Sequence, residues 1–447
     1  MPKDLDINVE EYQEIAIETQ DSQSQRAIEK LANLNRLSEL SIINTCITAE
    51  RMTWRLPLLR NLQKLVFRGI ERYLDPKDPD GNIRDIGEII LHSPHLKYLG
   101  LTAARDGIWF NASLKELSDF FHEERIKRDL NPLKLATLHL GIGFLPRQMF
   151  ENVPVPDNAA KLTDLTALET LRIDNWHIVP GSHSDAPDTT FEPSQFYVAT
   201  NLRRISVERL TPDAAALIRK CFESQESPRL TEIEVTRYFE TEPSKRNPYE
   251  VDSGRGHRYS VPLESIGLFH WRKIHIGMEI HDCIKTVEPL LKNFVAKCTE
   301  LEELAITMER EHLDNFCSEI LPSLGNLKVL LITGSSSMID KSIDEWGEEN
   351  EYEYEQRMLG IALKVFEGNR STRERDPKSP LLRYVGLGVN VYSCMLVLPP
   401  TPTSDNEFEV SAINLEGAGR RYRVSKLSME ESYSFNQLEE LRHEFWL

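Results

Sequence analysis

Hydrophobic residues recur along this chain in one short pattern, apolar-x-x-apolar-x-apolar, whose spacing changes from that of a helix to that of a β-strand. Residues 287–333 contain the pattern twice. A stripe of apolar residues at helical spacing begins at Val287 and precedes the copy that starts at Leu301; a second stripe precedes the copy that starts at Leu327. Neither helix-and-strand unit can bury its apolar face alone, so consecutive units are expected to stack.

The same pattern occurs at twelve places, whose first residues are mostly 25 to 41 positions apart. A single copy is weak evidence, because any leucine-rich amphipathic segment produces it by chance. Twelve copies predict an α/β protein, a curved solenoid with parallel strands on its concave face and mostly helices on its convex face. The alternative is an ordinary α/β sheet, but no glycine-rich phosphate loop accompanies the strands. The copies begin at Tyr12, Leu37, Leu62, Leu96, Leu135, Leu168, Leu202, Leu230, Trp271, Leu301, Leu327 and Leu382.

Segments rich in Pro, Gly, Ser or charge interrupt the repeats and predict loop insertions. The expected organisation is an N-terminal segment or minimal cap at 1–11, an irregular solenoid at 12–389 and a C-terminal cap at 390–447. The insertions are expected at 71–82, 179–195, 240–262, 334–356 and 369–380.

Two segments near the C-terminus carry more detailed expectations. The cap is predicted to contain strands at 392–398 and 421–427 and a short helix at 435–447. The insertion at 334–356 has eight acidic residues against Lys341. It is interpreted either as a solvated insertion or as an acidic docking loop.

The overall charge narrows the class of partner. The chain has 53 basic and 71 acidic residues, a net charge of −18, which disfavours nucleic acid and anionic membranes. The N-terminus has no basic start followed by an apolar core, and no long apolar run occurs. Six scattered cysteines without C-x-x-C spacing are expected to be buried, reduced thiols. Together these features predict a cytoplasmic or nuclear protein.

The motifs of common enzymes and metal sites are absent from the sequence. It has no G-x-x-x-x-G-K-[ST] phosphate loop and no G-x-S-x-G nucleophile elbow. The densest His/Cys group has irregular spacing that does not fit a zinc site; it comprises His281, Cys283, Cys298, His312 and Cys317. We therefore predict no cofactor, no metal and no enzymatic activity, while an α/β enzyme without recognisable motifs stays open as an alternative.

Two phrases carry a family resemblance, LHSPHLKYLGL at 91–101 and CTELEELAI at 298–306. With the recurring pattern, they resemble leucine-rich repeat proteins and, more narrowly, the irregular repeats that follow the F-box in fungal F-box proteins. The resemblance covers roughly residues 10–390 and implies a scaffold that recognises substrates for a ubiquitin ligase.

The N-terminal region departs from that family. No F-box is visible in the first 36 residues, and the first strand is already expected from Tyr12. A ubiquitin ligase adaptor is therefore expected as a partner only if an F-box lies upstream. A repeat protein that binds other proteins without any link to ubiquitin is the alternative.

The repeat pattern also predicts a binding face. If the strands are parallel, the residues between the apolar positions face the concave side, where a protein partner can bind. An ordinary solvated sheet face is the alternative. If the face does bind a partner, its basic residues in an acidic chain suggest an acidic or phosphorylated segment. The candidate binding residues are Lys64, Arg68, Tyr98, His139, Arg172, Arg204, Lys273, His275 and Tyr384.

Overall fold

The structure is a computed structural model of the whole chain, and its described part consists of most of the helices and strands with the turns beside them. The chain divides into two compact units. Unit 1 comprises residues 1–208 and 213–230, and unit 2 comprises residues 209–212 and 231–447. The described residues are 14–17, 38–43, 59–70, 81–103, 113–141, 144, 158–174, 193–226, 229–238, 261–278, 283–308, 310–334, 351–375, 382–387, 390–397, 412–417 and 420–427.

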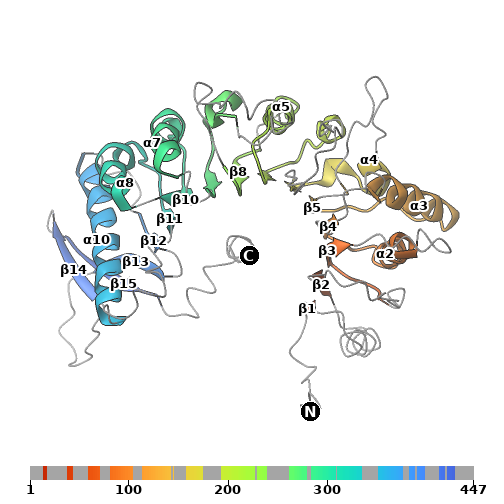
Figure 1. The fold of residues 1–447 in the computed structure, drawn as a ribbon, viewed down its shortest axis with the longest axis horizontal. Coiled ribbons are helices and arrows are strands. Elements are labelled where there is room, and N and C mark those ends of the chain that lie inside the picture. Colours follow the sequence, from red (N-terminus) through yellow and green to blue (C-terminus); the bar gives the residue numbers. More distant parts are fainter. Residues whose placement is uncertain are drawn as a thin grey trace, which may run out of the picture. The chain divides into compact units, whose positions relative to one another are not determined.

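Unit 1 contains a parallel sheet whose strands pair in the order of the sequence. Its helices lie on one side of that sheet, and α2 packs on α3 and α3 on α4 (Figure 1). The strands are β1 (Glu14–Ile17), β2 (Glu39–Ile43), β3 (Lys64–Ile70), β4 (Tyr98–Ala103), β5 (Thr137–Leu140), β6 (Thr170–Ile173) and β7 (Arg204–Val207). The helices are α2 (Gly81–Leu91), α3 (Ser113–Lys127), α4 (Asn158–Leu162) and α5 (Pro212–Glu223), with 3-10 turns η2 (Leu165–Ala167) and η3 (Ser194–Phe196).

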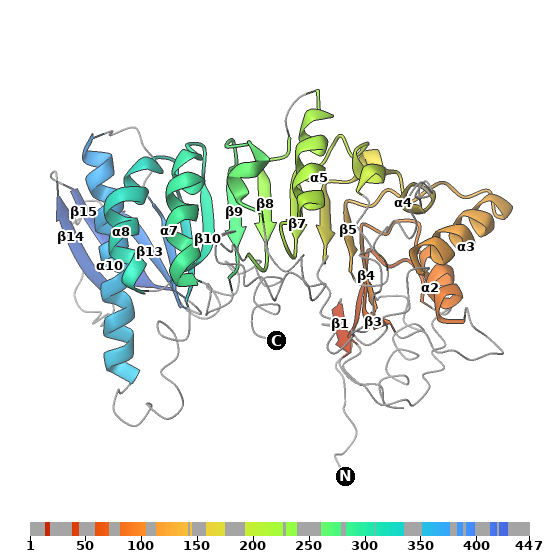
Figure 2. The same ribbon diagram turned by 45° about the horizontal axis from the view of Figure 1, so that its top comes forward.

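Unit 2 begins with five parallel strands and ends with three antiparallel ones. The helices α7, α8 and α10 lie together on one side of the parallel strands of unit 2 (Figure 2). The strands are β8 (Glu232–Val235), β9 (Lys273–Ile276), β10 (Glu303–Met308), β11 (Val329–Gly334), β12 (Tyr384–Leu387), β13 (Asn390–Val397), β14 (Ala412–Gly417) and β15 (Arg420–Lys426). The helical segments are η5 (Leu263–Ile266), α7 (Cys283–Asn293), η6 (Val295–Lys297), α8 (Arg310–Asn315), η7 (Phe316–Ile320), η8 (Leu321–Ser323) and α10 (Glu351–Arg375).

The apolar positions of the sequence pattern form the core of each unit. In β5 and the residues before it, Leu135, Leu138 and Leu140 are all completely buried. Burying one such side chain contributes roughly 1.5–3 kcal/mol, so the repeated pattern accounts for most of the packing between strands and helices. The twelve predicted strands correspond to β1–β12, which confirms an α/β fold with mostly parallel strands.

Helix α10 differs from the predicted loops. It runs from Glu351 to Arg375 and therefore includes the end of the insertion expected at 334–356 and the start of that expected at 369–380. Both loop boundaries were wrong: an apolar stripe at helical spacing forms the middle of α10, and the helix continues beyond that stripe into charged residues at both ends. The buried stripe comprises Met358, Leu359, Ala362, Val365 and Phe366.

The C-terminal strands agree more closely with the sequence pattern. β13 and β15 cover the strands predicted at 392–398 and 421–427, whereas β14 was not predicted. The predicted helix at 435–447 and the N-terminal segment 1–11 lie outside the described residues.

The described cysteines are inert structural residues. Cys221, Cys298, Cys317 and Cys394 are free and buried, as predicted. Burial raises the pKa of the Cys221 and Cys298 thiols to about 12, so both stay protonated near neutral pH.

Within the described ranges, each helix is too short or too polar to cross a bilayer.

Candidate protein-interaction face

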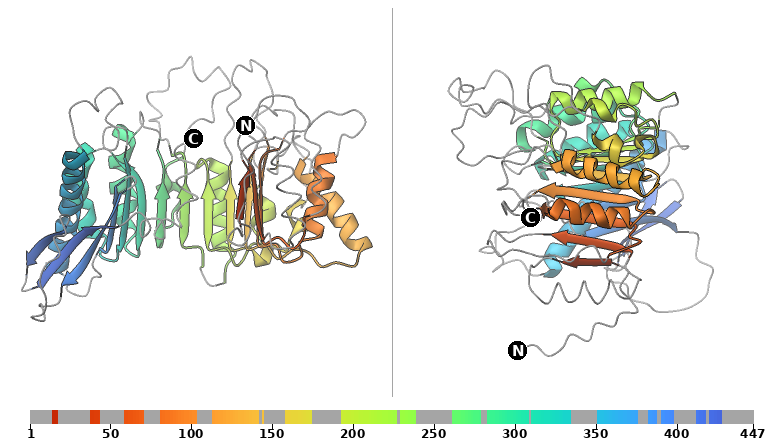
Figure 3. Two further views of the ribbon diagram at one scale, coloured as in Figure 1. Left: turned by 90° about the horizontal axis from the view of Figure 1, so that it is seen from below. Right: turned by 90° about the vertical axis from the view of Figure 1, so that its right-hand side faces the viewer.

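The side of the strands opposite the helices is called here the polar face of each unit. Side chains alternate along a strand, so the residues between the buried apolar positions point to this face. The parallel register aligns them in rows across neighbouring strands, which lie one beside the next in unit 1 (Figure 3). The first row is Glu39, Lys64, Tyr98, Thr137, Thr170 and Arg204 in unit 1, and Glu232, Lys273, Glu303, Val329 and Tyr384 in unit 2.

The second row lies two residues further along each strand and is far less accessible than the first. Its members are Ser41, Val66, Gly100, His139, Arg172 and Ser206 in unit 1, and Glu234, His275, Ala305, Leu331 and Gly386 in unit 2. The predicted binding residues are divided between the rows. Those in the first row are half-buried: Lys64, Tyr98, Arg204, Lys273 and Tyr384.

Three predicted binding residues of the second row are buried rather than exposed. His139 is 1% exposed, Arg172 6% and His275 7%. The prediction that these side chains face solvent was wrong, because side chains on adjacent strands only about 4.8 Å apart pack against one another, and neighbouring carboxylates hold these three close to the sheet. Arg68 lies in β3 opposite Ile43 of β2, and its side chain is outside the described part.

In unit 1, the carboxylate of Asp174 contacts the side chains of His139 and Arg172. Its Oδ2 lies 2.6 Å from Nε2 of His139, and its Oδ1 lies 3.5 Å from Nε of Arg172. Asp174 directly follows β6, and its backbone N–H donates to the carbonyl of Leu140 on β5. That hydrogen bond places the carboxylate beside the neighbouring strand, where it links β5 to β6.

Gly141 provides the space for this arrangement. It follows β5, between Thr102 of β4 and Asp174. A Cβ atom at Gly141 would lie 2.4 Å from Cγ2 of Thr102 and 3.5 Å from Cβ of Asp174. A larger residue would therefore push apart the side chains that flank it.

In unit 2, Glu303 plays the corresponding part. Its Oε1 lies 2.8 Å from Nε2 of His275 and its Oε2 lies 3.6 Å from Nζ of Lys273. Lys273 is also 3.6 Å from Glu232 on the other neighbouring strand. Burial alone would raise the pKa of Glu303, but the hydrogen bond from His275 and the positive charges of His275 and Lys273 outweigh it and lower that pKa.

The two histidine–carboxylate pairs are built to fix the sheet. A carboxylate that orients a histidine is also part of many acid–base catalysts, but a catalytic group must be reached by its substrate. His139 and His275 are almost inaccessible. Their geometry therefore favours a structural role, in which the pairs tie neighbouring strands together beneath the first row.

The lysines of the first row already have acidic neighbours. Nζ of Lys64 lies 3.5 Å from Glu39, and Lys273 lies between Glu232 and Glu303. These carboxylates occupy the same position of the repeat pattern as the lysines, so their proximity could have been anticipated from the sequence. The first row is therefore a surface of alternating charge rather than a basic patch.

Among the described residues, no group of three or more His, Cys, Asp or Glu side chains is placed to hold a metal ion. Cys298 and Cys317, two members of the densest His/Cys group, are buried in the helical layer of unit 2. His281 lies outside the described residues.

No model of a known protein family matches the sequence, and no curated protein matches it. Inferences about the function of the polar face therefore depend on its own geometry and on the repeat pattern.

Proposed function

We propose that this chain is a non-catalytic protein-interaction scaffold, which binds a protein partner at the first row of the polar face of unit 1. The observation that carries the proposal is the contrast between the two rows. Charged and aromatic side chains of the first row are half-buried, while His139 and His275 of the second row are buried and bonded to carboxylates that link neighbouring strands. A rigid, ordered support lowers the entropic cost of binding.

The repeat type is part of the same proposal. Helix-and-strand units with the pattern of leucine-rich repeats would curve when stacked and make the polar face concave. The resemblance to the repeats of fungal F-box proteins extends the proposal to substrate recognition in a ubiquitin ligase. Binding of the intact chain to a ubiquitin ligase adaptor would separate that role from the alternative, a repeat protein unconnected with ubiquitin.

The charge pattern bears on the partner. Arg204, Lys64 and Lys273 can donate to an acidic or phosphorylated segment, as the sequence suggested. Such a segment must compete with Glu39, Glu232 and Glu303 for the lysines. A partner that presents both signs of charge can keep every group paired, so we propose a mixed-charge segment.

Site-specific photo-crosslinking tests where a partner binds. A photoreactive amino acid replaces Thr170, a half-buried first-row residue of β6, in one variant and Lys220, an exposed residue of α5, in the other. The proposal predicts one defined protein that crosslinks through position 170 and not through position 220. Equal crosslinking at both positions, or none at position 170, would contradict binding at the polar face.

A further inference from the structure

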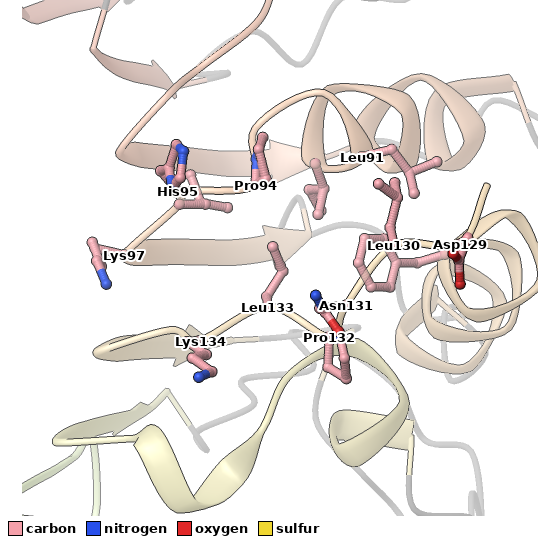
Figure 4. A pocket seen from close by; sticks show the side chains of 13 residues that line it. Leu91, Pro94, His95, Lys97, Asp129, Leu130, Asn131, Pro132, Leu133 and Lys134 are labelled. Atoms are coloured by element: carbon pink, nitrogen blue, oxygen red, sulfur yellow. The ribbon is translucent and has the colours of Figure 1, made fainter. Parts of the chain in front are cut away.

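A pocket of about 360 Å³ lies in unit 1, away from the polar face (Figure 4). Its walls come from two consecutive repeats: the end of α2 with the turn into β4, and the segment that joins α3 to β5. None of its lining residues belongs to the first or second row. They are Ile90, Leu91, Pro94, His95, Leu96, Lys97, Phe121, Asp129, Leu130, Asn131, Pro132, Leu133 and Lys134.

The floor of the pocket is apolar and its walls are partly exposed. Leu91, Phe121 and Leu133 are buried beneath it, whereas Pro94 and Pro132 are exposed at its sides. Leu130 lines the wall with 38% of its surface exposed, and Ile126, one helical turn earlier, is 61% exposed. In the described part of the chain, large hydrophobic side chains this exposed are few, so the presence of Leu130 in the wall of the pocket indicates a place where an apolar group can bind.

One end of the pocket is basic. His95, Lys97 and Lys134 are exposed and lie together at that end, while Asp129 lies at the other with Leu91 (Figure 4). No carboxylate within the described residues forms an ion pair with Lys97 or Lys134.

Other lysines of unit 1 differ from these two. Lys115, Lys127 and Lys220 each lie within 3 Å of a carboxylate. Lys97 and Lys134 lack such a neighbour among the described residues, although the chain has a net charge of −18. An acidic group of a ligand would therefore be favoured beside them.

The segment at 128–134 is held at both ends. Arg128 donates two hydrogen bonds to the carboxylate of Glu88 on α2, at 3.1 and 2.7 Å. At the other end, the carbonyl of Leu133 accepts hydrogen bonds from the hydroxyl of Thr163 and the backbone N–H of Asp164. The exposed wall of the pocket is therefore formed before any ligand binds, which reduces the cost of binding.

The end of α3 fixes the start of this wall. Asp129 has φ 53°, the left-handed conformation that ends many helices. The N–H of Asp129 donates to the carbonyl of Ile126, and that of Leu130 donates to the carbonyl of Arg125. This pair of bonds is the Schellman motif, and it directs the chain away from α3 and places Leu130 beside the pocket.

We propose that this pocket binds a short acidic peptide segment of a partner protein. One bulky apolar side chain of the segment enters the pocket, and neighbouring carboxylates lie against Lys97, Lys134 and His95. The volume lies in the range of ligand-binding pockets. The basic groups stand at one open end rather than converging inside, so they suit charges that flank an inserted side chain.

Two other ligand classes fit the pocket less well. Nucleic acid is disfavoured because the ring of Phe121 is buried and unavailable for stacking on a base. Small polar metabolites are disfavoured by the apolar floor.

Selection from a random peptide display library on the intact protein tests the proposal. We expect the wild type to enrich peptides with a bulky apolar residue next to two or more Asp or Glu residues. The pocket variant Lys97→Glu/Lys134→Glu should not enrich them. For one selected peptide, the Kd should rise at least about tenfold in that variant, since two attractive surface charges become repulsive, and binding to the wild type should weaken as salt is added.

The matched control carries the same change of charge at two lysines that already have acidic neighbours, Lys127→Glu/Lys220→Glu. It should bind the selected peptide like the wild type. A second variant, Leu130→Ser, tests the apolar part and should also raise the Kd, while its circular dichroism spectrum and melting temperature show whether it is folded. Failure here would leave the polar face untouched, because the crosslinking test uses other residues.

Four outcomes would overturn the proposal: no enriched peptides, enriched peptides without acidic residues, equal binding by the pocket variant and the wild type, or equal weakening in the control. Retention of the wild type on phosphatidylserine vesicles, with loss in the pocket variant, would also overturn it and would assign the basic end to a membrane surface.

Discussion

The two units place a histidine at the same strand position and pair it with a carboxylate from the next strand, but they do so from opposite ends of that strand. In unit 1, His139 is paired with Asp174, which follows β6. In unit 2, His275 is paired with Glu303, which begins β10. The two units thus place a histidine–carboxylate pair at the same strand position, although the carboxylate comes from a different place in the sequence of the repeat.

The carboxylates of Asp174 and Glu303 differ in their second basic neighbour, which is Arg172 in unit 1 and Lys273 in unit 2. Arg172 is buried although the side chain of Asp174 is 26% exposed, whereas the side chain of Lys273 is 43% exposed and has two acidic neighbours. An arginine keeps its charge when buried, while an exposed lysine is screened by water and salt. We infer that the unit 1 pair is rigid and costly to break, and that the unit 2 pair tolerates change.

The largest expected effect comes from Asp174→Ala. The change leaves Arg172 charged in a buried position and His139 without this carboxylate, so we expect a loss of about 2–3 kcal/mol in the free energy of unfolding. Urea unfolding followed by circular dichroism measures it, and faster hydrogen exchange in peptides from β5 and β6 localises it. A loss below that of the corresponding change in unit 2, Glu303→Ala, would reverse the comparison.

A smaller effect is expected from Glu303→Gln, about 1–2 kcal/mol at neutral pH for a lost charge-assisted hydrogen bond. Because folding lowers the pKa of Glu303, its contribution is present above its ordinary pKa of 4.5 and disappears as pH falls through the lower pKa of the folded state. Urea unfolding at several pH values should therefore show wild type and variant converging in acid. If the wild type and the variant still differ in the free energy of unfolding at acid pH, the charge of Glu303 is not the cause of the difference.

The smallest effect is expected from Lys273→Ala, roughly 0.5 kcal/mol, because half-exposed ion pairs contribute little. The difference from the wild type should shrink further when the unfolding is repeated in high salt. A loss in the free energy of unfolding as large as that of Asp174→Ala would show that the interactions of the two carboxylates are equivalent.

The strands could be predicted from the sequence because their signal is local. Each of the strands β1–β12 coincides with three apolar residues within six positions, and these twelve strands were predicted from that pattern. Helix α10 was missed at both ends, because its charged termini resemble a solvated loop in composition while only the middle carries the apolar stripe.

The contacts across strands could not be predicted in the same way. His139 and Asp174 are separated by a whole repeat, so the pattern shows that both point to one face but not that they meet at 2.6 Å. The pocket is lined by two turns, near Pro94 and Pro132, that come from different repeats. Neither turn has a distinctive signal alone, and the sequence does not show which carboxylates of the described residues lie near Lys97 and Lys134.

The central claim is that a partner protein binds the first row of the polar face. The most direct test measures the Kd of the protein captured through position 170, for the wild type and for two charge-reversal variants, by isothermal titration calorimetry. We predict that Lys64→Glu/Arg204→Glu, in the first row, raises the Kd about tenfold or more, and that Lys115→Glu/Lys220→Glu, on the helical side, leaves it unchanged. Equal Kd values for the two variants would contradict the account.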